Sequence, residues 1–166
     1  MLLKNEDKVL PIKKDVKTIA VIGPLADSQR DLIGSWSAAG DHTLTVNVLQ
    51  GIRERAGPSV KILHAKGAEI KVLDTNGFEQ ELQIAGKADH VILALGEAYW
   101  MSGEAASRSD LDLPGVQRQL AEKVIALGKP TTKVLMSGLP LTIEWLDKLP
   151  GAILETWFWI QKPEMP

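Results

Sequence analysis

A run of five apolar residues, Val91 to Leu95, constrains the fold of this chain more than any other stretch. So short and so apolar a run predicts a fully buried strand of a parallel sheet. It stops at Gly96 and opens into a polar segment that contains Glu97, Glu104 and Arg108. In open α/β sheets, ligands bind at the carboxyl ends of the strands. The sequence therefore predicts a functional site in this segment.

Strands and helices alternate along the rest of the chain. Further strands are predicted at 18–22, 60–65, 131–137 and 152–158, and helices at 48–56, 78–87, 116–127 and 141–146. The helix at 116–127 has the clearest helical spacing of apolar residues, and Gly128 follows it as a stop. This alternation predicts an α/β fold with a mainly parallel sheet and helices on both faces. Residues 1–17 are predicted to form an extended arm, and residues 18–158 one domain.

Charge and composition exclude several classes of function. A net charge of −2 offers no basic surface to nucleic acid or to an anionic membrane, and no apolar run is long enough to span a membrane. There is no cysteine, and His42, His64 and His90 show no ligand spacing, so no metal site is predicted. The sequence after the first strand, GPLAD, lacks the glycines of a nucleotide site, so no cofactor is predicted. Ser137 lacks the elbow motif of serine hydrolases and is interpreted as a loop hydroxyl.

The carboxylates of the polar segment remain as candidates for chemistry. Glu97 and Glu104 are either solvated loop acids, one of them paired with Arg108, or acid–base groups. The second role would need burial or a neighbouring carboxylate. Trp36, in the loop after the first strand, either covers the core or lies beside the carboxylates, where a sugar ring could stack on it.

Four segments follow one another along the chain: LLKNEDKVLPI, TIAVIGPLADSQRDLIGSWSAAG, VILALGEAYWMSGEAASRSDLDLP and LPGAILETWF. Together they resemble the second domain of glycoside hydrolase family 3 β-glucosidases, most closely the bacterial periplasmic type. The resemblance covers residues 2–158 and implies an (α/β)6 sandwich packed against a (β/α)8 barrel that supplies an aspartate nucleophile. It implies that Glu104 is the general acid/base. Trp36, Glu97 and Arg108 become the candidate substrate-binding residues, the last two because they shape the loop.

The activity that this resemblance implies is retaining hydrolysis of β-glucosides or oligosaccharides. Glu104 would protonate the leaving oxygen and then activate water, with a nucleophile about 5 Å away. That nucleophile is expected from the missing barrel domain, or from Glu97 or Asp110 of a second copy, and the chain alone is expected to be weak or inactive. The alternatives are a carbohydrate-binding module and a purely structural domain. No signal peptide is visible, whereas full-length relatives are expected to be periplasmic or secreted.

We expect the chain to be a truncated domain, because no barrel precedes residue 1 and residues 159–166 do not continue the family pattern. The codons for WIQKPEMP, read two nucleotides further on, permit D-S-K-T-G-N-A, which resembles the family's sequence and indicates a frameshift. Loss of the final helix and strand would leave a strand edge and an apolar patch open at 157–159. Lys133 is interpreted as marking an edge that faces water. We therefore expect a homodimer or swapped oligomer.

Overall fold

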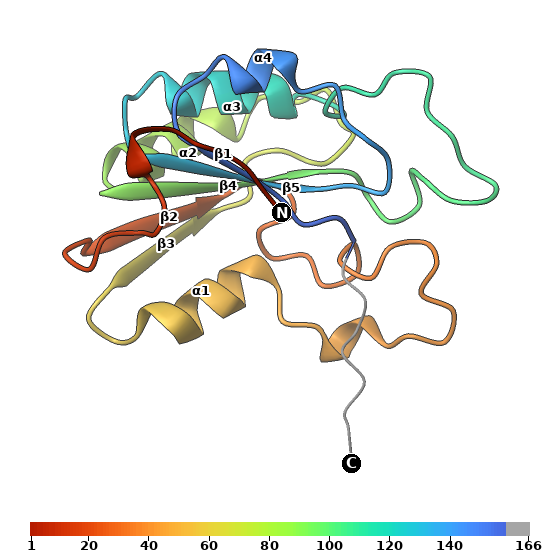
Figure 1. Cartoon of the computed structure of the whole chain (residues 1–166), viewed down its shortest axis with the longest axis horizontal. Coiled ribbons are helices and arrows are strands. Elements are labelled where there is room, and N and C mark those ends of the chain that lie inside the picture. The colour runs from red at the N-terminus through yellow and green to blue at the C-terminus, as the bar shows by residue number, and fades with distance from the viewer. Residues whose placement is uncertain (159–166) are drawn as a thin grey trace.

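The computed structural model describes residues 1–158, which form a six-stranded sheet with helices on both faces (Figure 1). The predicted fold class is confirmed, while the tail at 159–166 lies outside the described residues. The strands are β1 (Leu2–Asn5), β2 (Thr18–Ile22), β3 (Lys61–Ala65), β4 (His90–Gly96), β5 (Thr131–Met136) and β6 (Ala152–Glu155). The helices are α1 (Val48–Ala56), α2 (Phe78–Gly86), α3 (Gln117–Ile125) and α4 (Glu144–Asp147), with 3-10 turns at Glu6–Lys8 and His42–Leu44.

The order of the strands across the sheet is β1-β6-β5-β4-β2-β3. All neighbouring strands are parallel except β1, which runs antiparallel to β6. The carboxyl ends of β2, β4, β5 and β6 therefore lie at one end of the sheet, and their amino ends at the other. No helix within residues 1–158 is long and apolar enough to cross a membrane.

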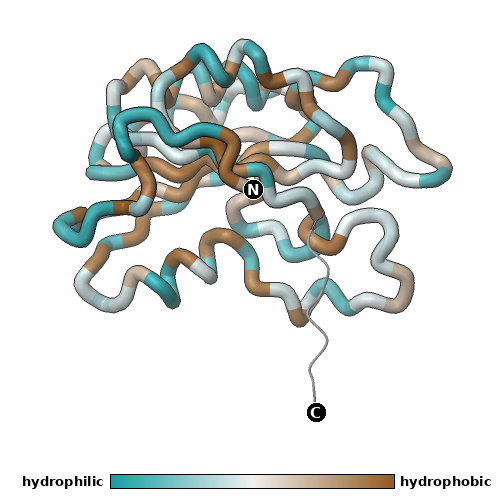
Figure 2. Tube along the Cα trace, in the orientation of Figure 1, coloured by the Kyte–Doolittle hydropathy of each residue, from teal (hydrophilic) through white to brown (hydrophobic). Residues whose placement is uncertain are grey.

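Alternate residues of the central strands supply two separate cores. On β2, Ala20 and Ile22 belong to one core, whereas Ile19 and Val21 belong to the other. The first core receives buried residues of α2, α3 and α4, and the second receives those of α1 (Figure 1). Figure 2 shows the hydrophobic residues concentrated in the strands between these layers. The strand β4 is buried along its whole length, as its apolar run predicts.

The N-terminal arm contributes a strand that the sequence did not predict. Residues of β1 pair with β6, so that Leu2 lies opposite Leu154 and Asn5 opposite Ala152. Within the described residues β6 therefore has a neighbour on each side, β1 and β5, and the outer strands of the sheet are β1 and β3. The homodimer stays a prediction, and an unpaired edge of β6 does not support it.

The position of Lys133 in the sheet also differs from the one expected from the sequence. It lies on β5, between β4 and β6, and is fully buried rather than at an edge facing water. Its Nζ donates hydrogen bonds to the carbonyl oxygens of Pro150 at 2.8 Å and Leu149 at 3.4 Å. Burial lowers the pKa of this ammonium group to about 8. The long side chain thus reaches backbone carbonyls at the start of β6 instead of solvent.

A buried carboxyl group lies where α2 meets the loop after β3. Glu81 is fully buried, and neither of its oxygens has a hydrogen-bond partner within residues 1–158. The backbone of Gly67 packs so closely on it that a Cβ atom there would overlap the carboxyl group. Burial raises the pKa of Glu81 from 4.5 to about 8, which keeps the group protonated in the folded protein at neutral pH.

This burial predicts a specific dependence of stability on pH. The folded protein holds the Glu81 proton between pH 4.5 and about 8, while the unfolded chain loses it. The stability contributed by the protonated carboxyl is complete below pH 4.5 and falls as the pH rises toward 8. We expect Glu81→Gln to remove most of this fall, as measured by urea unfolding at several pH values in the window. The exposed Glu79→Gln serves as control, and a wild-type pH slope in both variants would contradict the assignment.

Candidate active site

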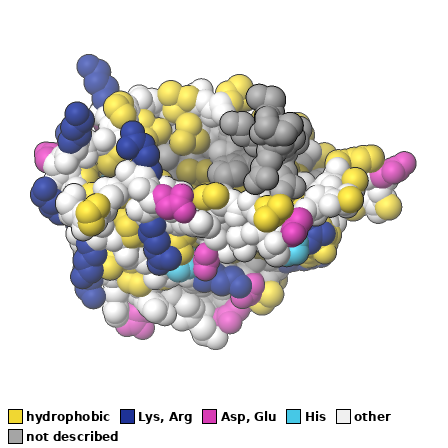
Figure 3. All heavy atoms as spheres, turned by 90° about the horizontal axis from the view of Figure 1, so that it is seen from below, with side chains coloured by type: hydrophobic (Ala, Val, Ile, Leu, Met, Phe, Trp, Pro, Cys, Tyr) yellow, Lys and Arg dark blue, Asp and Glu magenta, His cyan; other side chains and the backbone are white. Residues whose placement is uncertain are grey.

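Loops from four strands meet at the carboxyl end of the sheet. They follow β2 (residues 23–47), β4 (97–116), β5 (137–143) and β6 (156–158). In Figure 1 the loops after β2 and β4 project together from the same side of the molecule. In the space-filling view of Figure 3, the loop after β4 forms the projection at the right, with hydrophobic and acidic side chains near its tip. This is the end at which open α/β sheets bind ligands.

The buried side chain of Glu97 ties the loop after β4 to the loop after β5. Its Oε1 pairs with Arg108 Nη1 at 2.6 Å, and its Oε2 accepts hydrogen bonds from the backbone N–H groups of Gly138 and Leu139 at 2.9 and 3.3 Å. The Glu97 side chain is fully buried, and that of Arg108 is 15% exposed. Arg108 Nη2 also donates to the carbonyl oxygen of Asp112 at 2.6 Å. Both carboxylate oxygens of Glu97 are thus occupied, so it is not free to serve as the second carboxylate of a two-copy site.

Two further polar side chains position the ends of this loop. Gln117 brackets Gly96, accepting from its N–H at 2.9 Å and donating to its carbonyl oxygen at 2.8 Å. Asp112 Oδ1 accepts from Trp145 Nε1 at 2.8 Å and from the N–H of Leu113 at the same distance. The loop is therefore fixed to α3 and α4 at both of its ends.

Glu104 lies at the tip of a tight turn and is exposed. The turn is closed by an isolated bridge between Gly103 and Ala106. The side chain of Ser35 contacts Gly103 so closely that a Cβ there would lie 2.7 Å from Ser35 Oγ. Glu104 has no hydrogen bond or salt bridge to another side chain within the described part of the chain. Its carboxylate is thus presented to solvent on a turn whose base is packed.

Two tryptophans lie exposed on the same group of loops. Trp36 is 73% exposed and follows Ser35, so the Ser35–Gly103 contact puts it one residue from the base of the Glu104 turn. Its interpretation as a cover over the core is therefore wrong. Trp100 is 49% exposed. The ammonium group of Lys71 lies over its ring, 5.3 Å from the ring centroid.

The loop after β2 is joined to the loop after β4 by residues that sequence reasoning missed. Asp31 Oδ1 accepts a hydrogen bond from the N–H of Tyr99 at 2.9 Å, and the guanidinium of Arg30 stacks on the Tyr99 ring at 3.5 Å. The local sequence around Arg30 and Asp31 contains no motif that predicts contacts with Tyr99. Gln117 did leave a signal, because it is a polar residue at an apolar position of the helical repeat formed with Leu120 and Val124.

Polar groups are also buried at the ends of the two neighbouring strands. Ser137 is the first residue of the loop after β5, as interpreted from the sequence, but it is fully buried, and its Oγ has no hydrogen-bond partner within residues 1–158. Glu155 ends β6, accepts from the N–H of Trp157 at 2.9 Å, and has its pKa raised chiefly by burial. Across residues 1–158, no group of three or more histidine and carboxylate side chains is placed to hold a metal ion.

Comparison with known proteins identifies relatives for the whole described chain. The sequence profile of the glycosyl hydrolase family 3 C-terminal domain matches residues 1–163. The periplasmic beta-glucosidase of Salmonella typhimurium is 44% identical over 95% of this chain, and the beta-xylosidase of Formosa agariphila is 37% identical over 95%. These alignments cover 23% and 22% of the two relatives, so the chain spans about a fifth to a quarter of their length.

Solved structures show the same similarity. The beta-glucosidase from Listeria innocua in complex with isofagomine superimposes with a TM-score of 0.84 and 36% identity, covering 95% of this chain and 21% of that one. An exo-beta-xylosidase of the same family, in complex with a xylobiose aziridine probe, gives a TM-score of 0.86 at 32% identity. These two structural superpositions support the six-stranded α/β architecture.

The Glu97–Arg108 pair generates a prediction about stability. Arg108→Met would leave a buried carboxylate without its cation, so we expect the free energy of unfolding to fall by about 3–5 kcal/mol. Urea unfolding measures this change. As a control, Glu122→Gln breaks the exposed pair with Arg118 and should cost less than about 1 kcal/mol. A similar small loss in both variants would show that the buried pair does not stabilise the loop.

Proposed function

The chain belongs to glycosyl hydrolase family 3 as its C-terminal domain, and on that premise we propose that it carries the general acid/base of a retaining β-glucosidase, Glu104. The observation that supports this assignment is the contrast between two carboxylates of one loop. Glu97 is fully buried, with both oxygens bonded, whereas Glu104 is exposed at the tip of a turn. An acid/base group must reach the substrate, and of these two Glu104 can do so.

A second domain is required for this function. A carboxylic acid works as a general acid near neutral pH when burial or a neighbouring charge favours its protonated form. Glu104 is exposed in this chain, so a covering domain must supply that environment. The loops beside it leave Trp36, Leu44 and Trp100 exposed, as expected of a surface that another domain covers. We infer that the barrel domain of the full-length enzyme packs here and contributes the nucleophile.

The reaction then follows the two steps of retaining hydrolysis. A nucleophilic carboxylate of the barrel attacks the anomeric carbon while Glu104 donates its proton to the leaving oxygen, forming a glycosyl-enzyme. Glu104, now ionised, takes a proton from water, and that water releases the sugar with its original configuration. The Glu97–Arg108 pair touches neither substrate nor water in this scheme. It positions the turn that carries Glu104.

The proposed substrate is a β-glucoside. The Salmonella typhimurium β-glucosidase is more similar to this chain than the Formosa agariphila β-xylosidase is, at 44% against 37% identity. Trp36 would stack against the apolar face of a sugar ring at the rim of the site.

A chimeric enzyme tests the role of Glu104. This chain would replace the matching segment of the Salmonella typhimurium enzyme, and hydrolysis of aryl and alkyl β-glucosides would be measured. We expect Glu104→Gln to lower kcat for the alkyl glucoside by about 10²–10⁴-fold, the usual worth of general acid–base catalysis. Aryl glucosides should lose less in the first step, because their leaving groups need little protonation.

Azide provides a second readout for the same variant. It attacks the glycosyl-enzyme without base assistance, so it should restore turnover of aryl glucosides by Glu104→Gln and give a β-glycosyl azide. The control variant is Glu144→Gln, an exposed carboxylate at the start of α4, and it should behave as the unmodified chimera. Full activity of Glu104→Gln in an active chimera would refute the assignment.

A second candidate function is sugar binding without turnover. The exposure of Trp36 and Trp100 on adjoining loops favours it, because exposed aromatic rings provide stacking surfaces for sugars. Calorimetry of the chain with cellobiose would detect such binding, and Trp36→Ala should weaken it by about tenfold, the equivalent of one stacked ring. Binding that is unchanged in Trp36→Ala would exclude this surface.

A further inference from the structure

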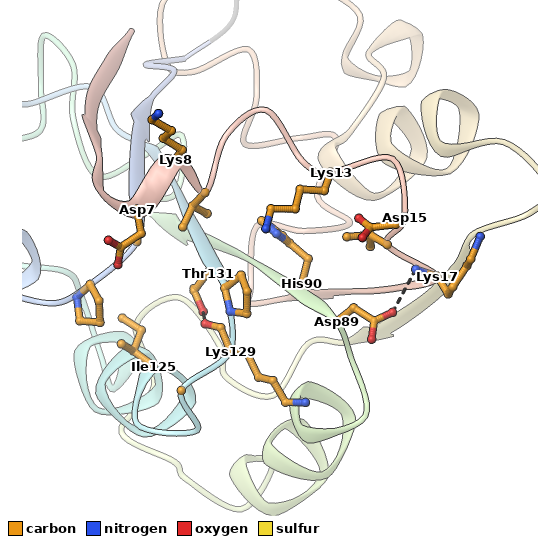
Figure 4. A pocket seen from close by; sticks show the side chains of 16 residues that line it. Asp7, Lys8, Lys13, Asp15, Lys17, Asp89, His90, Ile125, Lys129 and Thr131 are labelled. Carbon is orange, nitrogen blue, oxygen red and sulfur yellow. Dashed lines mark hydrogen bonds between the residues drawn. The ribbon is translucent and has the colours of Figure 1, made fainter.

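A pocket lies at the opposite end of the sheet from Glu104. It is a cavity of about 530 Å³ between the N-terminal arm and the residues that precede β4, β5 and β6 (Figure 4). Residues at the amino ends of the strands line it, including Lys17, Asp89, Thr131 and Gly151. In a parallel sheet these positions are separated from the loops of the proposed active site by the full length of the strands. A small ligand fits a cavity of this size.

The inner wall of the pocket combines apolar groups with a buried imidazole. Val9, Val16, Ile125 and Pro130 contribute apolar surface. His90 is 98% buried, and Figure 4 shows its ring directed into the middle of the pocket. Its Nε2 lies 3.0 Å from Thr132 Oγ1, whereas Nδ1 has no hydrogen bond to any residue in the range 1–158. One nitrogen of a deeply buried side chain is therefore left for a ligand.

Cationic side chains surround the opening. Four lysines line the pocket, and none of them forms a salt bridge with another described residue: Lys8, Lys13, Lys17 and Lys129. In Figure 4 the side chain of Lys13 extends from the arm toward the ring of His90. Three aspartates also line the pocket, so the balance is one positive charge. Asp89 accepts hydrogen bonds from the backbone N–H groups of Lys17 and Thr18, at 3.0 and 2.9 Å, and so fixes the arm.

We propose that this pocket binds a small aromatic carboxylate, with the carboxylate between Lys13 and His90 and the ring on the apolar wall. The apolar wall disfavours a bare inorganic anion or a free sugar, and the lysines disfavour a neutral hydrocarbon. Burial lowers the pKa of His90 to about 4, so the ring is neutral at pH 7. The hydroxyl of Thr132 can donate to Nε2, which leaves the ring proton on Nδ1 as a donor to the carboxylate.

Three probes separate the contributions of charge and ring. Benzoate carries both, benzyl alcohol carries the ring without the charge, and inorganic phosphate carries charge without the ring. By calorimetry and NMR on the full chain, benzoate should bind with a Kd below about 10 mM and shift the His90 ring resonances. Benzyl alcohol and phosphate should each bind at least about fivefold more weakly, since each lacks one of the two contacts.

Variants place the probe in this pocket. Lys13→Gln should weaken benzoate binding by about fivefold, the upper end of what one exposed ion pair contributes, while leaving thermal unfolding unchanged. Lys148→Gln removes an exposed lysine outside the pocket, and Glu104→Gln alters the other end of the sheet; both should bind benzoate normally. The proposal is overturned if benzoate does not bind, if benzyl alcohol binds equally well, or if Lys13→Gln and Lys148→Gln behave alike. Because Glu104 is not involved, these outcomes are independent of the glycosidase assignment.

Discussion

The buried ion pair between Glu97 and Arg108 connects the fold of this domain to the turn that carries Glu104, its proposed general acid/base. Glu97 is the first residue after the central strand β4, and its carboxylate binds the arginine of its own loop and two backbone N–H groups of the loop after β5. A charged pair removed from water is stable when hydrogen bonds satisfy its remaining groups, as they do here. Three chain segments are thereby fixed around one carboxylate. The turn with Glu104 can stand out from the protein because its base is anchored in this way.

Most of the architecture follows from sequence patterns. Alternating apolar strands and amphipathic helices predict the parallel sheet and its two covering layers, because both patterns depend on local periodicity. The strand β1 escaped prediction, since Leu2–Asn5 becomes a strand only by pairing with β6, about 150 residues away in sequence. The position of Lys133 was predicted wrongly for a related reason. Its charge suggested an edge, but its length lets the ammonium group reach the carbonyl oxygens of Leu149 and Pro150 from a central strand.

The candidate site could be located from the sequence, but the division of roles within it could not. The position of the loop follows from the end of β4, and family resemblance points to Glu104. Burial distinguishes the two carboxylates: Glu97 and Glu104 are seven positions apart and chemically alike, yet Glu97 is enclosed and bonded while Glu104 faces solvent. The pocket beneath the N-terminal arm was not predicted at all, because it depends on how residues 7–17 fold back over the starts of three strands.

Backbone ¹⁵N order parameters of residues 97–112 test the central claim, that a buried pair fixes an exposed acid, most directly. Anchoring through Glu97, Gly138 and Asp31 predicts values of about 0.8 through the turn at 103–106, close to those of rigid backbone, although Glu104 is exposed. Values below about 0.6 across the turn, the range of flexible segments, would show that the ion pair does not position the acid.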